Sequence, residues 1–268
     1  MTTMKRDQYE RRREPRRTED EPLALHGSAE RLLHVLLALA QSDAPLTAKA
    51  IAARLDLPLS TVYRYLKTLG NLHFIVESAM SGRYALGPRC VQLASNFQKN
   101  SDLIARCYPE MQELARQTGE TIALVMPLKS EALCLETIES PQPIRYSFSR
   151  GAVRPLLRGA SAKALLPYID TETLEETIAA SQLSPAEIEQ LRHEIETIRA
   201  NGYAVSEGEV DPGAWAVGVP LLDADGLLEA SLSVIAPVYR LTPDSRNFIV
   251  NCTRETGKRL SATHLQEE

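Results

Sequence analysis

The spacing of apolar residues over positions 28–69 constrains the fold more than any other feature of this chain. Apolar residues recur at steps of three and four over 32–40, again over 51–55, and again over 62–69. This period predicts three amphipathic helices that bury one face each. Leu57-Pro58 separates the second helix from the third, because proline disfavours helix in the residue before it. Two short helices joined by a tight turn indicate a helix-turn-helix unit.

Polar residues and a hairpin complete the prediction for this part of the chain. Ser28, Thr47, and Ser60 or its neighbour stand where N-caps of the three helices are expected. Residues 74–77 and 83–86 read as two strands, and a hairpin after the third helix is a wing. We therefore predict a winged helix-turn-helix that ends near Gly87-Pro88.

The third predicted helix carries a polar face that suits duplex DNA. With Val62 and Leu69 turned inward, the opposite side presents Ser60, Thr61, Arg64 and Lys67, with Tyr63 at its edge. A helix fits the major groove, where Arg pairs with guanine and hydroxyls reach phosphates or base edges. Arg83 of the wing is a further candidate contact. A simply solvated face is the alternative for each of these residues.

Charge is divided unevenly along the 268 residues. Residues 1–95 hold 14 Lys/Arg against 10 Asp/Glu, a charge of +4, whereas residues 96–268 hold 16 against 25, a charge of −9. This asymmetry permits nucleic-acid binding by the first part only. Residues 1–22 lack periodicity and contain RRREPRR, so we expect a disordered basic tail, with a phosphate-contacting arm as the alternative.

The rest of the chain predicts a linker helix and a second domain. Residues 23–88 form the expected DNA-binding domain, 89–104 a linker helix and 105–268 the second domain. Strands are expected at 121–127, 132–138, 144–148, 203–206, 214–222 and 227–235, and helices at 162–168, 171–180, 184–200 and 243–263. Ser184-Pro185-Ala186-Glu187 is a capping box, and residues 223–226 are a hairpin turn. A sheet with flanking helices gives the α+β class.

Several function classes lack support in the sequence. The longest apolar run, over 32–40, is far shorter than the roughly 20 residues that span a bilayer, and the N-terminus has no secretory signal pattern, so we expect a cytoplasmic protein. The four cysteines and five histidines show no metal-ligand spacing. We therefore expect no metal site, no cofactor and no membrane partner.

An enzyme with a nucleic-acid-binding accessory domain is one interpretation of the two domains. Ser161 and Lys163 form an S-x-K pair, and acids cluster at Glu207, Glu209 and Asp211. However, the sequence contains no G-x-S-x-G elbow, no phosphate loop and no histidine near either cluster. We expect no catalytic residues.

The last predicted strands indicate a ligand pocket or a solvated face. Ser231 and Ser233 share one face of their strand, opposite its apolar residues. These serines lie in solvent or, with Ser161 and Ser206, surround a cavity that has Trp215 at its wall. In the second interpretation, hydroxyls and helix amides at 159–161 hold a carboxylate, so the effector is an organic or aromatic acid.

These motifs together resemble the IclR family of bacterial transcription regulators. The resemblance is carried by TAKAIAARLDLPLSTVYRYLKTL, GRYALG, TGETIALV, RGASAKALL and NGYAVSEGE, in this order over residues 25–260. It implies a winged helix-turn-helix, a linker helix and a GAF-like α/β domain that binds a small-molecule effector. It also implies a homodimer or homotetramer on a palindromic double-stranded DNA operator.

The resemblance and the residue pattern together give two sets of candidate site residues. The DNA-binding set is Thr47, Leu59, Ser60, Thr61, Tyr63, Arg64, Lys67 and Arg83. The effector-binding set is Gly159, Ala160, Ser161, Ser206, Trp215, Ala216, Ser231 and Ser233. Leu59 and Tyr63 depart from the family's frequent basic residue and histidine, and Ala162 replaces a frequent glycine. The operator and the effector are therefore not transferable from relatives.

Overall fold

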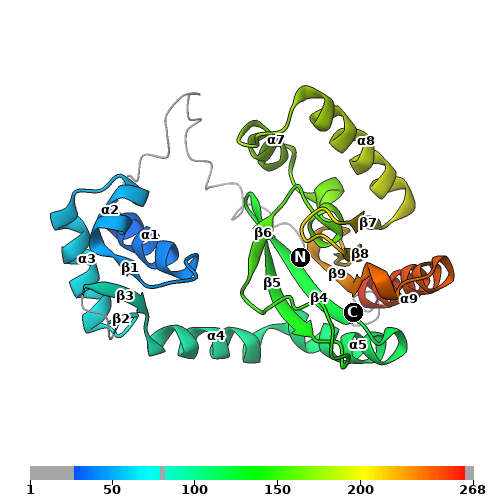
Figure 1. Cartoon of the computed structure of the whole chain (residues 1–268), viewed down its shortest axis with the longest axis horizontal. Helices are drawn as coiled ribbons and strands as arrows, with labels where there is room; N and C mark the ends of the chain where they lie inside the picture. The colour runs from blue at the N-terminus through cyan, green and yellow to red at the C-terminus, as the bar shows by residue number, and fades with distance from the viewer. Residues whose placement is uncertain (1–26, 79–81, 263–268) are drawn as a thin grey trace, which may run out of the picture. The chain divides into compact units, whose positions relative to one another are not determined.

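The computed structural model describes residues 27–78 and 82–262, which form two compact units that divide between Phe97 and Gln98 (Figure 1). The predicted basic tail, residues 1–22, lies outside the described residues. No helix in the described ranges is long and apolar enough to cross a membrane.

The first unit is the predicted winged helix-turn-helix. Its elements are α1 (Ser28–Ala40), β1 (Leu46–Thr47), α2 (Ala48–Leu55), α3 (Leu59–Asn71), β2 (Ile75–Glu77) and β3 (Arg83–Leu86). The strands form an antiparallel sheet in the order β1-β3-β2. Val35, Ile51, Val62 and Leu69 meet in its core and are at most 2% exposed. The apolar period thus placed all three helices correctly.

Only one of the three predicted N-caps in this unit is confirmed. Thr47 Oγ1 accepts a hydrogen bond from the Ala50 amide at 3.2 Å and caps α2. Ser28 instead lies inside the first turn of α1, where its hydroxyl is 3.2 Å from the hydroxyl of Tyr65. Pro58 takes the N-cap position of α3, so Ser60 is already helical. Proline suits this place because its fixed φ matches a helix start.

Two helices follow the wing. Helix α4 (Pro88–Asn100) buries none of its residues, and α5 (Asp102–Thr118) begins after Ser101. Ser101 Oγ accepts a hydrogen bond from the Ile104 amide at 3.3 Å, so the break between the helices is an N-cap. Gly119 ends α5 in the left-handed conformation, which glycine adopts at low cost.

The second unit is built on a six-stranded antiparallel sheet in the order β6-β5-β4-β9-β8-β7. The strands are β4 (Thr121–Leu128), β5 (Glu131–Ile138), β6 (Val153–Pro155), β7 (Ala204–Glu207), β8 (Ala214–Leu222) and β9 (Leu228–Pro237). The helical segments are α6 (Ala160–Lys163), η2 (Leu166–Tyr168), α7 (Thr171–Ala179), α8 (Pro185–Asn201), η3 (Val238–Arg240) and α9 (Pro243–Ala262). The α+β class is as predicted.

Each face of this sheet has its own apolar core. Helices α5 and α9 lie side by side over one face, where Met111 and Leu114 pack with Ile249 and Leu260 (Figure 1). On the other face, Val125 and Leu165 belong to a second core that includes residues of α7 and α8. Successive residues of a strand therefore enter different cores.

One predicted strand is wrong, and one predicted helix is divided. Residues 144–148 are irregular, and the edge strand is β6 instead. Side chains bind the backbone of the irregular segment: Thr121 donates to the carbonyl of Tyr146 and Arg240 to that of Ile144. The helix predicted over 162–168 is α6 followed by η2, with Pro167 inside the second piece.

Candidate DNA-binding surface and effector pocket

Helix α3 has one buried face and one exposed polar face. Val62, Tyr65, Leu66 and Leu69 are at most 3% exposed and anchor the helix in the core of the first unit. Their spacing turns Ser60, Tyr63, Arg64 and Lys67 outward, and all four are exposed. Thr61 and Leu59 are half-buried, at the margin of this face.

The exposed face of α3 is cationic. The helix contains no acidic residue, and within the described residues neither Arg64 nor Lys67 forms an ion pair. The Arg64 guanidinium carbon lies 5.4 Å from the centre of the Tyr65 ring, an arrangement that holds the side chain along the helix. The two charges are thus available to phosphates and base edges.

Thr47 and Arg83 pair with each other on β1 and β3, and their side chains already have partners. The Thr47 hydroxyl caps α2, and Arg83 of the wing donates to the Pro45 carbonyl at 3.0 Å while it remains exposed. The hydrogen bond fixes the wing cation beside the loop before α2. It leaves part of the guanidinium free, since this group carries five N–H donors.

The second unit contains a cavity of about 50 Å³ at the N-terminus of α6. Five of the predicted effector-binding residues line it: Gly159, Ala160, Ser161, Ser206 and Ala216. The remaining wall comes from β4, β5, β6, β8 and β9 and from irregular segments, and includes Tyr146, Phe148, Arg154, Val210 and Asp211.

Trp215 does not line this cavity. Its neighbours Ala214 and Ala216 face the cavity, and because strand residues alternate, Trp215 points to the opposite face. There it is 2% exposed, in the core beneath α5 and α9. The indole is therefore a structural residue of the sheet.

Ser231 and Ser233 do not line the cavity either, and neither lies in solvent. Both are fully buried on the sheet face that α6 covers, and Ser231 Oγ donates to the Ser161 carbonyl at 2.6 Å. A Cβ atom on Gly218, which pairs with Ser233, would lie only 2.5 Å from the Ala160 carbonyl oxygen. The small side chains of Gly218, Ser231 and Ser233 thus allow α6 to pack closely against the sheet.

The amides at the start of α6 already have acceptors. The Gly159 amide donates to Glu209 Oε2 at 3.1 Å, and the Ala160 amide donates to Ser206 Oγ at 2.9 Å. The predicted use of these two amides to hold a carboxylate has no support in the structure, since internal groups occupy them. Charge for an anionic ligand has to come from elsewhere in the wall.

Lys163 has a structural environment. Its ammonium lies 2.6 Å from Glu194 Oε2 and 2.9 Å from Glu209 Oε1, and its side chain is 9% exposed. Burial alone lowers the pKa of Lys163, but the hydrogen bonds to Glu194 and Glu209 outweigh it and raise the pKa. A lysine held protonated in this way cannot activate Ser161 as a base.

Sequence reasoning missed the polar residues of the irregular segments. The Tyr146 hydroxyl donates to Asp211 Oδ2 at 2.5 Å, and burial, with this carboxylate, raises the pKa of Tyr146 to about 12. Arg154 belongs to β6, which was not predicted. Their positions depend on contacts between segments far apart in sequence, so no local pattern could have indicated them.

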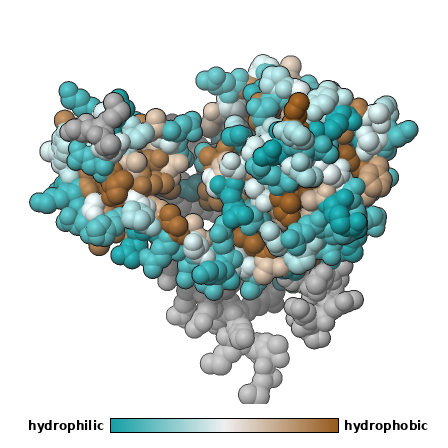
Figure 2. Space-filling model, turned by 60° about the horizontal axis from the view of Figure 1, so that its bottom comes forward, coloured by the Kyte–Doolittle hydropathy of each residue, from teal (hydrophilic) through white to brown (hydrophobic). Residues whose placement is uncertain are grey.

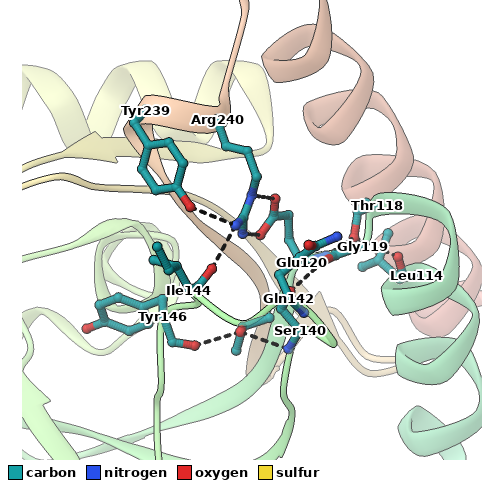
Figure 3. A network of polar contacts seen from close by, with 11 residues as sticks. Leu114, Thr118, Gly119, Glu120, Ser140, Gln142, Ile144, Tyr146, Tyr239 and Arg240 are labelled. Carbon is teal, nitrogen blue, oxygen red and sulfur yellow. Dashed lines mark hydrogen bonds and ion pairs between the residues drawn. The ribbon is translucent and has the colours of Figure 1, made fainter.

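A network of polar contacts anchors the segment that carries Tyr146 (Figure 3). Arg240 makes two hydrogen bonds to the Glu120 carboxylate, at 2.6 and 2.9 Å, and a third to the Ile144 carbonyl at 2.7 Å. Thr121 Oγ1 donates to the Tyr146 carbonyl at 2.7 Å, and Ser140 Oγ donates to the Gly119 carbonyl at 2.6 Å. The network thus joins the cavity wall to the C-terminal end of α5.

Within the described ranges, no group of three or more His, Cys, Asp or Glu side chains is arranged to hold a metal ion.

Models of two known protein domains match the two parts of the chain. The model of the IclR helix-turn-helix domain matches residues 28–78, and that of the bacterial transcriptional regulator IclR C-terminal domain matches residues 96–262. Among curated relatives, the HTH-type transcriptional repressor AllR of Klebsiella pneumoniae is 28% identical over 93% of this chain and 95% of its own length. The regulator KipR of Bacillus subtilis is 27% identical over 81% of this chain and 88% of its own.

Solved structures share the fold. An IclR transcriptional regulator from Alicyclobacillus acidocaldarius has a TM-score of 0.76 at 26% identity, covering 88% of this chain and 98% of its own. An IclR family regulator from Brucella abortus has a TM-score of 0.78 at 21% identity, covering 88% and 92%. The relatives are named as regulators and repressors, not as enzymes. The chain belongs to the IclR family of bacterial transcriptional regulators, with an N-terminal DNA-binding domain and a C-terminal effector-binding domain.

Proposed function

We propose that this regulator reads an operator by placing α3 in the major groove. The observation that carries the proposal is the exposed face of Ser60, Tyr63, Arg64 and Lys67 on a helix with no acidic residue. Arg64 is assigned to a base edge and Lys67 to phosphate. Leu59 and Thr61 lie at the margin of this face, and Thr47 and Arg83, which pair on neighbouring strands, are the further proposed contacts.

The working form is proposed to be a homodimer, or a pair of dimers, on a palindromic site. Apolar areas interrupt the hydrophilic surface (brown in Figure 2). On α4, Val91, Leu93 and Phe97 are 68%, 55% and 53% exposed, and on α1, Leu33 and Leu37 are 56% and 52% exposed. A second copy of the chain would remove these side chains from water.

The cavity at α6 is proposed as the effector site, with an organic or aromatic acid as its ligand. Effector binding would shift the population of dimers between forms that bind the operator well and poorly, in proportion to its different affinity for the two. The regulator would act in the cytoplasm, where the chromosome is. Tyr146 supports the coupling, because its segment is tied to the end of α5 through Thr121.

A gel-shift titration of the full chain against DNA from upstream of its own gene, at two salt concentrations, tests the DNA proposal. Arg64→Ala should abolish the preference for this DNA over a scrambled duplex. Lys67→Ala should weaken binding to both and reduce the salt slope by about 1. Lys258→Ala, at an exposed position of α9, is the charge-matched control. Unchanged selectivity in Arg64→Ala would contradict the placement of α3.

A further inference from the structure

A pocket of about 290 Å³ lies where the C-terminal ends of α8 and β8 meet α9 (Figure 1). It shares no lining residue with the cavity at α6. Of its described lining residues, three are basic, Arg199, Arg254 and Lys258, and none is acidic. Residues 96–268 carry a charge of −9, so a lining with bases alone contrasts with the rest of this domain. Such a lining attracts an anion.

Arg254 is the cation of this pocket that has no counterion. Arg199 pairs with Glu196 at 2.7 Å and Lys258 with Glu255 at 3.2 Å, and exposed pairs of this kind contribute little. Arg254 is half-buried and, within the described ranges, forms no ion pair and no hydrogen bond. The C-terminus of α8 adds about half a negative charge, which the charge of Arg254 exceeds. The pocket thus keeps a positive charge.

The position of Arg254 is restrained by the residues around it. Its guanidinium carbon lies 5.3 Å from the centre of the Tyr203 ring, and this stacking leaves the N–H groups at the guanidinium edge available. Lys258 and Ser261 follow on α9 at steps of four and three residues, so they lie on the same face of the helix. Ser261 Oγ accepts a hydrogen bond from the Leu222 amide at 3.2 Å, and its own proton has no acceptor among the described residues. Guanidinium, ammonium and hydroxyl donors therefore meet at one pocket.

We propose that this pocket binds the phosphate group of a small phosphorylated metabolite, with Arg254 as the residue that pairs with it. A guanidinium matches phosphate through two parallel hydrogen bonds, and an ammonium such as that of Lys258 adds charge without a fixed geometry. A phosphate monoester carries about −1.5 to −2 charge at neutral pH and has three acceptor oxygens, which suits several cationic donors better than a monocarboxylate does. The pocket shares no residue with the proposed effector cavity or with the exposed face of α3, and the inference depends on neither.

The rest of the lining gives room for the carbon part of the ligand. Val219, Pro220 and Leu222 of β8 supply apolar side chains. Gly257 brings α9 close to them, because a Cβ atom there would lie only 2.7 Å from Val219 Cγ2. A concave site with an apolar wall is typical of small-molecule binding. The phosphates of duplex DNA are disfavoured as ligands, because the surrounding domain is acidic and repels a polyanion.

Calorimetry on the full-length protein tests the inference, with glycerol 3-phosphate as the probe and glycerol and inorganic phosphate as its two parts. Glycerol 3-phosphate should bind and glycerol should not, and inorganic phosphate should bind more weakly because it leaves the apolar wall uncovered. Arg254→Gln should weaken glycerol 3-phosphate binding by about ten- to a hundredfold, the range for a charge-assisted hydrogen bond. Arg254→Lys, which keeps the charge but loses the paired geometry, should fall between wild type and Arg254→Gln.

Two control variants remove the same charge elsewhere in the domain. Arg192→Gln changes an exposed position of α8 outside the pocket, and Arg154→Gln changes the wall of the α6 cavity. Both should bind glycerol 3-phosphate as the wild type does. Circular dichroism verifies that each variant is folded.

Four results would overturn the inference. The first two are no binding of glycerol 3-phosphate at high millimolar concentration, and equal affinity for inorganic phosphate and glycerol 3-phosphate. The third is affinity that survives Arg254→Gln; a loss in Arg154→Gln instead would place the probe in the other cavity. The fourth is displacement of the probe by a duplex of unrelated sequence, with weaker duplex binding in Arg254→Gln, which would assign the pocket to nucleic acid.

Discussion

Removal of Arg240 should destabilise the effector domain strongly, because it leaves the buried Glu120 carboxylate without a counterion. The Glu120 side chain is 7% exposed, and both of its oxygens accept hydrogen bonds from the Arg240 guanidinium. In Arg240→Met the carboxylate keeps its burial and loses its counterion, while the Ile144 carbonyl loses a donor. The aliphatic part of the arginine side chain is largely preserved by methionine, so the change tests charge and hydrogen bonding.

The expected cost follows from the burial of the two partners. Breaking a buried ion pair by removing one partner costs about 3–5 kcal/mol. The Arg240 side chain is 23% exposed, so water partly screens the charge left on Glu120. We therefore expect Arg240→Met to lower the free energy of unfolding by about 3 kcal/mol. For a domain of this size each kcal/mol lowers the melting temperature by about 2–4 °C, which gives a decrease of about 6–12 °C.

The single tryptophan of the chain makes the measurement specific to one domain. Trp215 is buried in the effector domain, so its fluorescence during urea unfolding reports that domain alone. Arg240→Met, Glu120→Gln and the double variant form a thermodynamic cycle. The double variant should be more stable than Arg240→Met, because no buried charge is left. A cost below about 1 kcal/mol for Arg240→Met, or effects that simply add, would refute the reasoning.

Two further predictions concern the packing of α6 and the buried thiols. Gly218→Ala should destabilise the effector domain by about 1–3 kcal/mol because its Cβ would lie 2.5 Å from the Ala160 carbonyl oxygen. Gly70→Ala, in open space on α3, should stabilise its own domain by about 0.5–1 kcal/mol, and thermal unfolding followed by circular dichroism would measure both. Burial raises the pKa of Cys107 to about 11 and of Cys134 to about 12, so neither should react with a disulfide reagent at pH 8 before unfolding. The same shifts should lower the free energy of unfolding as pH rises above about 8.5, where the unfolded thiols lose protons and the folded ones do not; reaction of both thiols in the native protein would contradict their burial.

The elements of the fold that could be predicted are those with a local cause. Helix α8 begins at a capping box, in which Ser184 and Glu187 bind each other's backbone amides, and both residues are close in sequence. The α2 cap at Thr47 and the turn between β8 and β9 are of the same kind. By contrast, the segment around Ile144 has the composition of a strand. Its backbone groups are bound by Arg240, 96 positions away, which no local pattern shows.

The proposed effector site also has residues that the sequence could indicate and residues that it could not. The pocket interpretation of the sequence predicted Gly159, Ala160, Ser161, Ser206 and Ala216 at a cavity, and all five line it. Small residues on a sheet face, however, have two causes: they leave space for a ligand or for another backbone. Ser231 and Ser233 belong to the second case, and the absence of a Cβ on Gly218, where α6 approaches the sheet, is the physical sign of it.

Several wall residues of the proposed effector site lie where sequence patterns are weakest. Tyr146, Arg154 and Asp211 come from irregular segments or a three-residue edge strand, and tertiary contacts bring them to one cavity. The fold tolerates change at such places because few backbone hydrogen bonds of the sheet depend on them. The core of β8 and β9, in contrast, must keep small residues for α6 to pack. The charge and shape of the cavity wall can therefore change while the sheet architecture is retained.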